Sequence, residues 1–322
     1  MGTDGRHDLG QALVLGPGGR LGTAWTAGLA AGLRGSGVDL GGADLIVGTS
    51  AGAIVGAVLA TGQDPSRLAA LPARPPAEAS SAPRRPDRAV MGAVLAVLGD
   101  RGLDPADARR RVGRIALETV DAEAEGRLIA QRAALIAAED WPSLPLLIPA
   151  VDAETGEPVV WDAAAGVPLA HAVAASSAFP GVEPPVAVGG RRCLDGALRD
   201  GTNVDLAAGA RTVVVIDPLA HRHPRPAGDD VHLVAPDAAT ARLLDSERSD
   251  PQAWAAAYQA GEAGAAAAAA ALRAHWRPAP HRRDRSAPAR PAGVSRACRQ
   301  SRGADGSSAT GPGSAGDPQP AG

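Results

Sequence analysis

A serine flanked by glycines, in Gly48-Thr49-Ser50-Ala51-Gly52, is the clearest candidate for a reactive side chain. It follows an apolar run at 44–47 and precedes a small, apolar stretch at 51–61, so we expect a sharp turn from a strand into a helix. The glycines would let strand and helix approach closely, and the helix N-terminus would stabilise a developing oxyanion. The pattern predicts a nucleophile elbow. A turn of small residues in a Gly- and Ala-rich chain is the other interpretation.

A second candidate is the turn Gly16-Pro17-Gly18-Gly19-Arg20-Leu21-Gly22. It matches the dinucleotide fingerprint G-x-G-x-x-G poorly, and no acidic residue ends the second expected strand to hold a ribose. We interpret it as an anion-binding turn in which the N–H groups of Gly18 and Gly19 bind a carbonyl oxygen in the transition state. Pro17 has no N–H to contribute. A plain glycine-rich connection is the alternative.

The third candidate is Asp195-Gly196-Ala197, which follows Val186-Ala187-Val188 and Gly189-Gly190. An Asp-Gly pair after a strand is common in turns, so this triplet alone favours turn chemistry. Its value as a functional signal comes from its combination with the other two candidates.

Hydrophobic periodicity predicts the elements that must position these residues. Strands are expected at 11–15, 44–47, 145–152, 157–161, 212–217 and 231–235, and helices at 23–34, 51–61, 88–98, 105–119, 121–138, 168–176, 236–246 and 251–276. Strand, glycine turn, helix, strand and helix in succession favour a parallel sheet with helical crossovers. The proline-rich residues 72–88 predict a loop, and Asp-Ala-Glu-Thr-Gly between the third and fourth strands predicts a hairpin.

In this order the three motifs resemble those of patatin-like phospholipases, which have a glycine-rich oxyanion turn, then G-x-S-x-G, then D-G-G/A far downstream. Further stretches similar to bacterial members are Gly22-Thr23-Ala24-Trp25, Ala-Ala-Ser-Ser-Ala-Phe-Pro-Gly at 174–181, and Thr-Asn-Val-Asp-Leu-Ala-Ala-Gly-Ala at 202–210. The likeness covers residues 10–276 and is weakest across 72–140.

This resemblance implies an α/β fold of three layers, α/β/α, with a mostly parallel central sheet in a domain at 1–277. Residues 278–322 are expected to form a disordered tail rich in Pro, Arg, Gly and Ser. The implied activity is that of a serine lipid acyl hydrolase of the phospholipase A or esterase type. No cofactor and no metal are implied.

Carried over position by position, the resemblance implies a Ser–Asp dyad with Ser50 as nucleophile and Asp195 as base. Gly18 and Gly19 would be the oxyanion donors, and the motif-supporting residues would be Gly16, Gly22, Gly48, Gly52 and Gly196. Two positions depart from the pattern. Pro17 stands where relatives often have glycine, and Leu21 replaces a frequent basic residue, with Arg20 one place earlier.

Composition excludes several other chemistries. The chain has no lysine, which rules out P-loop, protein-kinase and Schiff-base lysine chemistry. Aromatic residues make up 2%, too few for base-stacking platforms. The net charge is −3, and seven Arg and three Asp at 278–322 leave 25 Arg against 32 acidic residues elsewhere. Nucleic acid is therefore not an expected partner. The two cysteines and seven histidines form no zinc-site spacing.

The polar start of the chain shows no secretory signal, and polar residues interrupt the apolar runs before they reach transmembrane length. We expect a cytoplasmic protein without a transmembrane segment, and a lipid or acyl ester as its substrate. Peripheral contact with a membrane would suit that substrate, and the arginines at 109–111 are a candidate for contact with anionic lipid.

Two alternatives stay open on sequence grounds. One is an α/β-hydrolase-type esterase with a Ser-His-Asp triad, whose base would be His221, His223 or His232. An elbow as early as residue 50 follows too few strands for that fold. The other is a non-catalytic binding or regulatory protein on the same scaffold, motivated by Pro17 and the displaced Arg20.

Overall fold

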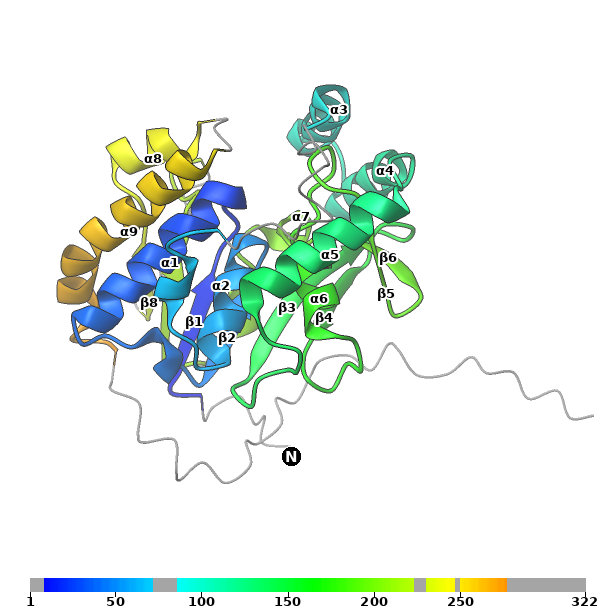
Figure 1. Ribbon diagram of the computed structural model, residues 1–322. Helices are drawn as coiled ribbons and strands as arrows, with labels where there is room; N and C mark the ends of the chain where they lie inside the picture. Colours follow the sequence, from blue (N-terminus) through cyan, green and yellow to red (C-terminus); the bar gives the residue numbers. More distant parts are fainter. Residues whose placement is uncertain (1–8, 72–85, 223–229, 247–249, 277–322) are drawn as a thin grey trace, which may run out of the picture. The chain divides into compact units, whose positions relative to one another are not determined.

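Short, mostly apolar segments form the parallel strands at the centre of the molecule (Figure 1). The computed structural model describes residues 9–71, 86–222, 230–246 and 250–276, all within one structural unit that spans Met1–Ala292. The strands are β1 (Gln11–Leu15), β2 (Leu45–Gly48), β3 (Leu146–Asp152), β4 (Pro158–Trp161), β5 (Val186–Val188), β6 (Arg191–Asp195), β7 (Thr212–Ile216) and β8 (Val231–Val234). β1 and β2 are buried along their whole length, as expected of strands covered on both faces.

In the described part of the chain, these strands build one eight-stranded sheet with the order β5-β6-β3-β2-β1-β7-β8. β3, β2, β1, β7 and β8 run parallel, with Leu15 opposite Gly48 at the ends of β1 and β2. β4 and β6 both pair with β3 in antiparallel fashion, and β5 pairs with β6. The carboxyl ends of β1 and β2 therefore meet at one edge, where open α/β sheets bind ligands.

The α-helices are α1 (Gly19–Gly35), α2 (Ala51–Ala60), α3 (Arg88–Gly99), α4 (Pro105–Leu117), α5 (Ala122–Ile136), α6 (Leu169–Ser176), α7 (Ala197–Asp200), α8 (Ala238–Leu244) and α9 (Pro251–Leu272). Three short 3-10 turns complete the elements: η1 (Leu40–Gly42), η2 (Pro65–Leu68) and η3 (Val204–Ala207). Asp side chains cap the N-termini of α3, α4, α5, α8 and α9 by accepting backbone N–H groups of the first turn.

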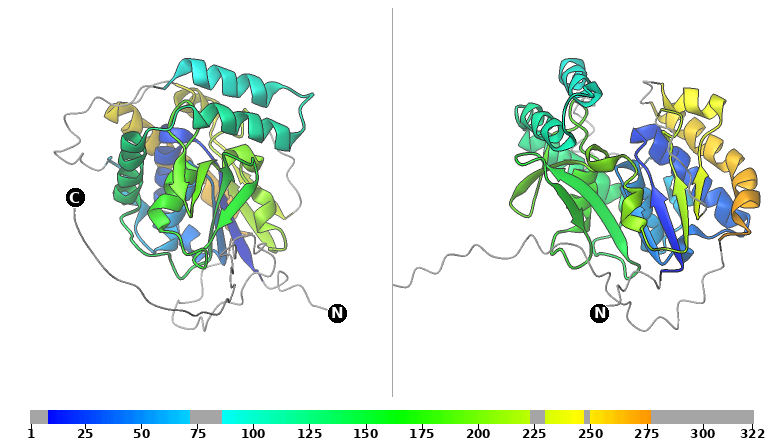
Figure 2. Two further views of the ribbon diagram at one scale, coloured as in Figure 1. Left: turned by 90° about the vertical axis from the view of Figure 1, so that its right-hand side faces the viewer. Right: turned by 180° about the vertical axis from the view of Figure 1, so that it is seen from behind.

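Alternate side chains of the strands define two cores. Leu13 and Leu15 point into the larger one, which α1, α2, α5, α6 and α9 cover. Ala12 and Val14 point to the opposite face, where η3 contributes Ala207. Further along that face, α3, α4 and α7 cover residues of β3 and β6. The two views in Figure 2 show the sheet between these helices. The fold is thus a three-layer α/β/α arrangement with a mostly parallel central sheet.

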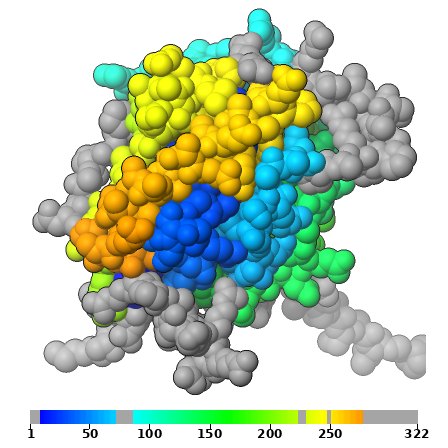
Figure 3. All heavy atoms as spheres, turned by 60° about the vertical axis from the view of Figure 1, so that its left-hand side comes forward, coloured from blue at the N-terminus to red at the C-terminus, as the bar shows by residue number. Residues whose placement is uncertain are grey.

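Glycine and alanine allow α9 to lie directly against α1, as Figure 3 shows on one face of the molecule. A Cβ at Gly28 of α1 would lie 2.0 Å from the carbonyl oxygen of Tyr258, and one at Gly261 of α9 would lie 2.1 Å from that of Trp25. The two backbones touch only because these positions have no side chain. Trp254 of α9 also donates its indole N–H to the carbonyl of Leu68 at 2.8 Å.

The predicted strands and helices are confirmed, with ends that differ by a few residues. Two predictions of detail are wrong. The glycine turn does not extend to residue 22, because α1 begins at Gly19 and the Gly22 N–H already makes a helical hydrogen bond of 2.9 Å to the Gly18 carbonyl. Asp195 does not simply follow the strand at 186–188, since it ends a further strand, β6, joined to β5 by Gly189 and Gly190.

Some predictions fall outside the described residues. The expected tail at 278–322 does so entirely, and most of the expected loop at 72–88 does, since the description resumes at Pro86. A membrane-spanning helix needs about 20 apolar residues in succession. None of the helices in the described ranges meets the length and hydropathy that a bilayer span requires.

Candidate active site

Ser50 occupies a strained turn between β2 and α2. Its backbone angles are φ 55° and ψ −113°, a conformation that non-glycine residues rarely adopt, and it is the N-cap residue of α2. Neither flanking glycine has room for a side chain. A Cβ at Gly52 would lie 2.0 Å from the Leu15 carbonyl oxygen, and one at Gly48 would lie 2.6 Å from that of Gly52. The expected strand-to-helix elbow is therefore confirmed as a backbone feature.

Asp195 lies at the end of β6, and its carboxylate accepts a hydrogen bond of 2.8 Å from the Ser50 hydroxyl, Oγ to Oδ2. The two residues are 145 positions apart in the chain, and both side chains are buried. The Ala197 N–H donates to the other carboxylate oxygen at 2.9 Å. Gly196 likewise has no room for a side chain, because a Cβ there would lie 2.2 Å from the Pro149 carbonyl oxygen.

Burial raises the pKa of Asp195 from 3.8 to about 7. The Ala197 N–H, the Ser50 hydroxyl and the charge of Arg132 all act in the opposite direction, but they offset burial only in part. Arg132 of α5 donates from Nε to Ser177 Oγ at 2.8 Å and lies 3.6 Å from Glu183. A carboxylate with a pKa near neutrality is a much better general base than an ordinary one, because its conjugate acid is weaker.

The C-terminal end of α6 contacts both residues of the pair. Ser176 Oγ accepts the N–H of Ser50 at 3.2 Å, and the Ser176 carbonyl accepts the N–H of Gly196 at 3.2 Å. The Asp195 N–H donates to the Ala178 carbonyl at 3.1 Å. Residues 174–181 resemble bacterial patatin-like phospholipases in sequence, but no sequence pattern predicts their contacts with both Ser50 and the Asp195-Gly196 segment.

The glycine turn follows β1, directly beside the elbow. The Thr49 N–H donates to the Leu15 carbonyl at 2.9 Å, and the Gly16 N–H donates to the Ile216 carbonyl at 2.9 Å. Gly18 is the N-cap residue of α1, and Gly19, with φ +58°, is its first residue. N–H groups at this end of a helix have no acceptor within the helix. Their position suits the anion-binding role that the sequence predicts, which stays a prediction.

The other residues that the sequence singled out have separate contacts. The Arg20 guanidinium lies 5.8 Å from the ring centroid of Trp254 on α9. His221 bonds to Asp245 at 3.0 Å, and His232 stacks on His275 at 3.8 Å between ring centroids. His223 lies outside the described residues. Neither described imidazole is thus paired with Asp195, as a Ser-His-Asp triad would require.

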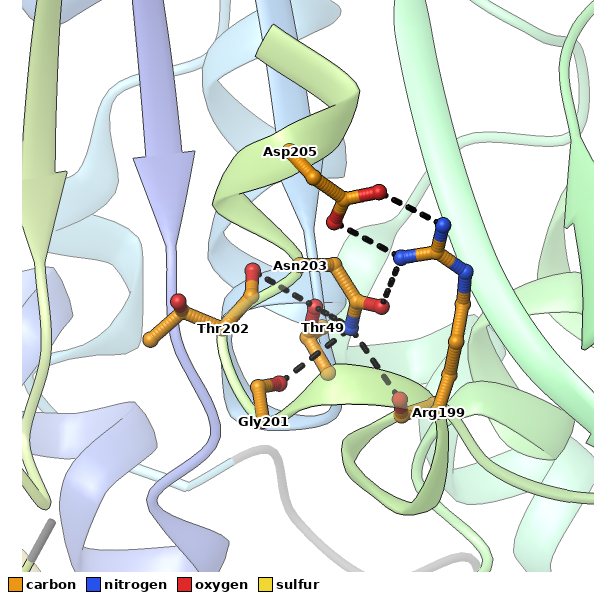
Figure 4. Close-up of polar contacts among 7 residues, drawn as sticks. Thr49, Arg199, Gly201, Thr202, Asn203 and Asp205 are labelled. Atoms are coloured by element: carbon orange, nitrogen blue, oxygen red, sulfur yellow. Dashed lines mark hydrogen bonds and ion pairs between the residues drawn. The ribbon is translucent and has the colours of Figure 1, made fainter. Parts of the chain in front are cut away.

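A buried polar network adjoins the pair and was not recognised from the sequence as a functional feature. Figure 4 shows Asn203 between Thr49, which precedes the serine, and the guanidinium of Arg199. Asp205 holds that guanidinium with two contacts of 2.8 and 2.6 Å. In the described part of the chain, no three His, Cys, Asp or Glu side chains gather into a group that could hold a metal ion.

The raised pKa of Asp195 gives a prediction for stability. Between pH 4 and 7 the folded protein keeps a proton that the unfolded chain releases, so unfolding becomes easier as the pH rises through this window and stays easier above it. Asp195→Asn removes the ionisable group while keeping its shape. We expect it to raise the free energy of unfolding on the order of a few kcal/mol at pH 8, and very little at pH 4.

Chemical denaturation at both pH values measures this difference. Asp152→Asn is the matched control, because Asp152 is also a buried aspartate at the end of a strand but pairs with Arg191 at 3.1 Å. That substitution should not stabilise the protein. A variant Asp195→Asn that is no more stable than the wild type at pH 8 would contradict the assignment.

Comparison with known proteins agrees with these motifs. A family model described as patatin-like phospholipase matches residues 13–208, which include the glycine turn, the elbow and Asp195. Among solved structures, the crystal structure of VipD from Legionella pneumophila is similar at 11% sequence identity, over 83% of this chain and 67% of that chain, with a TM-score of 0.42. A comparison with curated proteins found no match. The family model covers well over half of the chain, and the chain belongs to the patatin-like phospholipase family.

Proposed function

We propose that the protein is a serine acyl hydrolase of the phospholipase A or esterase type that acts through Ser50 and Asp195. The family is one of lipid acyl hydrolases, which supports the substrate class. The observation that carries the assignment of residues is the 2.8 Å hydrogen bond from Ser50 Oγ to Asp195 Oδ2 in a buried setting. It is the geometry that a nucleophile and its base require.

In the first half of the reaction, Ser50 Oγ attacks the carbonyl carbon of the ester and its proton moves to Asp195 Oδ2. The N–H groups of Gly18 and Gly19 stabilise the negative charge on the carbonyl oxygen. When the tetrahedral intermediate collapses, the leaving alcohol takes the proton back from Asp195. An acyl-serine ester remains.

In the second half, a water molecule gives its proton to Asp195 and attacks the acyl carbon. The fatty acid leaves and the proton returns to Ser50. The same carboxylate thus acts as base twice, as general acid–base catalysis by one residue allows. Because the N–H of Ser50 is held by Ser176 Oγ, the serine backbone stays fixed while its side chain reacts.

Substitution of either residue tests the proposal. Ser50→Ala should lower kcat for nitrophenyl esters and for phospholipids at least about 1,000-fold, because no acyl-enzyme can form. Asp195→Asn should lower it roughly 100- to 10,000-fold, the usual contribution of a general base. Asp152→Asn serves as a control and should keep the wild-type rate. Hydrolysis that survives either site substitution, or failure of Ser50 to react with a fluorophosphonate probe in folded protein, would favour the non-catalytic alternative.

The pH dependence of the rate provides a separate prediction. Asp195 must be ionised to accept the proton, so kcat/KM should rise with pH and reach half its maximum near the pKa of about 7. An imidazole base would give a similar curve, since histidine titrates in the same range. His221→Ala, His223→Ala and His232→Ala should therefore each retain both the rate and the midpoint. Loss of activity in one of them would support the Ser-His-Asp alternative.

A lipid surface is the partner that we propose for α3. Leu95 and Leu98 are 54% and 41% exposed on this helix, whose only charged residue is Arg88. Arg101 follows the helix and is exposed, and α4 beside it carries further exposed arginines. Exposed apolar side chains bordered by arginine are typical of contact with anionic lipid. The helix adjoins the site, because Val94 belongs to the same hydrophobic cluster as Leu194 and Leu198, which flank Asp195 in the chain.

The double variant Leu95→Glu/Leu98→Glu should weaken sedimentation with phosphatidylglycerol vesicles several-fold, because charges replace the apolar contact. Its activity on a short soluble ester should not change. Leu233→Glu is the matched control, since Leu233 is equally exposed at 41% but lies on β8. Equal vesicle binding by the double variant, or a change of oligomeric state in its place, would contradict this role for α3.

A further inference from the structure

One buried amide contacts the chain neighbours of both proposed catalytic residues. The Asn203 side chain is fully buried. Its Nδ2 donates to Thr49 Oγ1 at 3.0 Å and to the Gly196 carbonyl at 3.0 Å, and lies 3.2 Å from the Gly201 carbonyl. Thr49 directly precedes Ser50, and Gly196 directly follows Asp195.

The orientation of this amide is determined by its partners. On one side lie two carbonyl oxygens and the Thr49 hydroxyl, which uses its own proton on the Thr202 carbonyl at 3.3 Å. On the other side, the Arg199 guanidinium donates to Asn203 Oδ1 at 2.9 Å. A flipped amide would place its oxygen against carbonyl oxygens and its NH₂ group against a cation. Only one orientation satisfies all the contacts.

An ion pair keeps this arrangement in place from outside. Arg199 and Asp205 make a two-point contact of 2.8 and 2.6 Å, in which the planar guanidinium faces the carboxylate (Figure 4). The backbone of Asn203 adopts the left-handed conformation, with φ 59° and ψ 35°, which asparagine tolerates better than most residues. The backbone conformation of Asn203 and the hydrogen bond to its Oδ1 therefore both restrain the side chain.

Sheet topology explains why such a bridge is needed. Ser50 follows β2 and Asp195 ends β6, but β3 lies between these strands in the sheet. The sheet connects β2 and β6 only through β3, and the paired residues of β2 and β3 end at Val47, three positions before Ser50. Among the described residues, Ser176 and Asn203 each bond to both sides of the site.

We propose that Asn203 is a positioning residue. It holds Thr49, next to Ser50, and Gly196, next to Asp195, at a fixed separation, so that Ser50 Oγ and Asp195 Oδ2 stay within reacting distance. This inference rests on the proposed function. Displacement of reacting groups by about 1 Å can lower a rate roughly 100-fold, so the loss of one such bridge has a measurable effect on the chemical step. Asn203 itself touches neither the hydroxyl nor the carboxylate.

The first test is Asn203→Ala, assayed with a soluble nitrophenyl ester and with a fluorophosphonate probe. We expect kcat to fall about 10- to 100-fold while KM changes less than about threefold, because positioning affects the chemical step more than substrate binding. The rate at which the probe labels Ser50 should fall in the same proportion, since it depends on the same proton transfer.

Gln63→Ala is the matched control for general loss of stability. Gln63 is also an amide that bridges two segments, bonding to Thr61 Oγ1 and to the Ile136 carbonyl, both at 2.8 Å, and it belongs to no part of the site. It should lower the melting temperature without lowering kcat. If Asn203→Ala loses no more activity than Gln63→Ala, the amide is merely structural and the proposal fails.

A second pair of variants covers the case in which Asn203→Ala does not fold. Thr49→Val removes the hydroxyl that accepts from Asn203 and keeps the shape of the side chain, whereas Thr49→Ser retains that hydroxyl. The valine variant should lose kcat, and the serine variant should recover most of it. Equal activity of the two variants would overturn the proposal. A wild-type protein that neither hydrolyses esters nor reacts with the probe would instead refute the proposed function itself.

Discussion

The hydrogen bond between Ser50 and Asp195 is the contact on which the proposed function of this molecule depends. It joins two buried side chains that are 145 residues apart. Neither residue alone would suffice for the proposed hydrolysis, because a serine hydroxyl needs a base to become a nucleophile and an ordinary carboxylate is a weak base. Burial supplies what the residue type lacks, since it raises the pKa of Asp195 to about 7.

Several features of the site lower stability and suit chemistry. Ser50 has a strained backbone, and Asp195 has a carboxylate whose ionisation burial opposes. Gly48, Gly52 and Gly196 permit contacts with backbone atoms that any side chain would prevent. Rigid surroundings must hold such a site together, as strained residues persist only where the rest of the structure determines them. The α6 terminus and the Asn203 network each form hydrogen bonds to both sides of the site.

Predictions from the sequence succeeded where the signal is local. The strand at 11–15 and the helices at 105–119 and 121–138 follow from short patterns, because apolar periodicity is set within a few residues. β6 was missed because Arg191-Arg192-Cys193-Leu194 lacks alternation of apolar and polar residues. A signal was present nonetheless, since a Gly-Gly pair between two short runs is typical of a hairpin turn.

By itself, the sequence determined the chemistry that is available: a serine between glycines, a glycine turn beside it, an aspartate before glycine, and no lysine to support other reactions. It also determined most of the strands and helices in their order along the chain, though not β6, because periodicity is a local property. Only the tertiary structure decided that Ser50 and Asp195 meet, that burial changes the pKa of the aspartate, and that Asn203 joins the two turns. Contacts and desolvation depend on which distant segments pack together, and the spacing of residues along the chain does not show which segments these are.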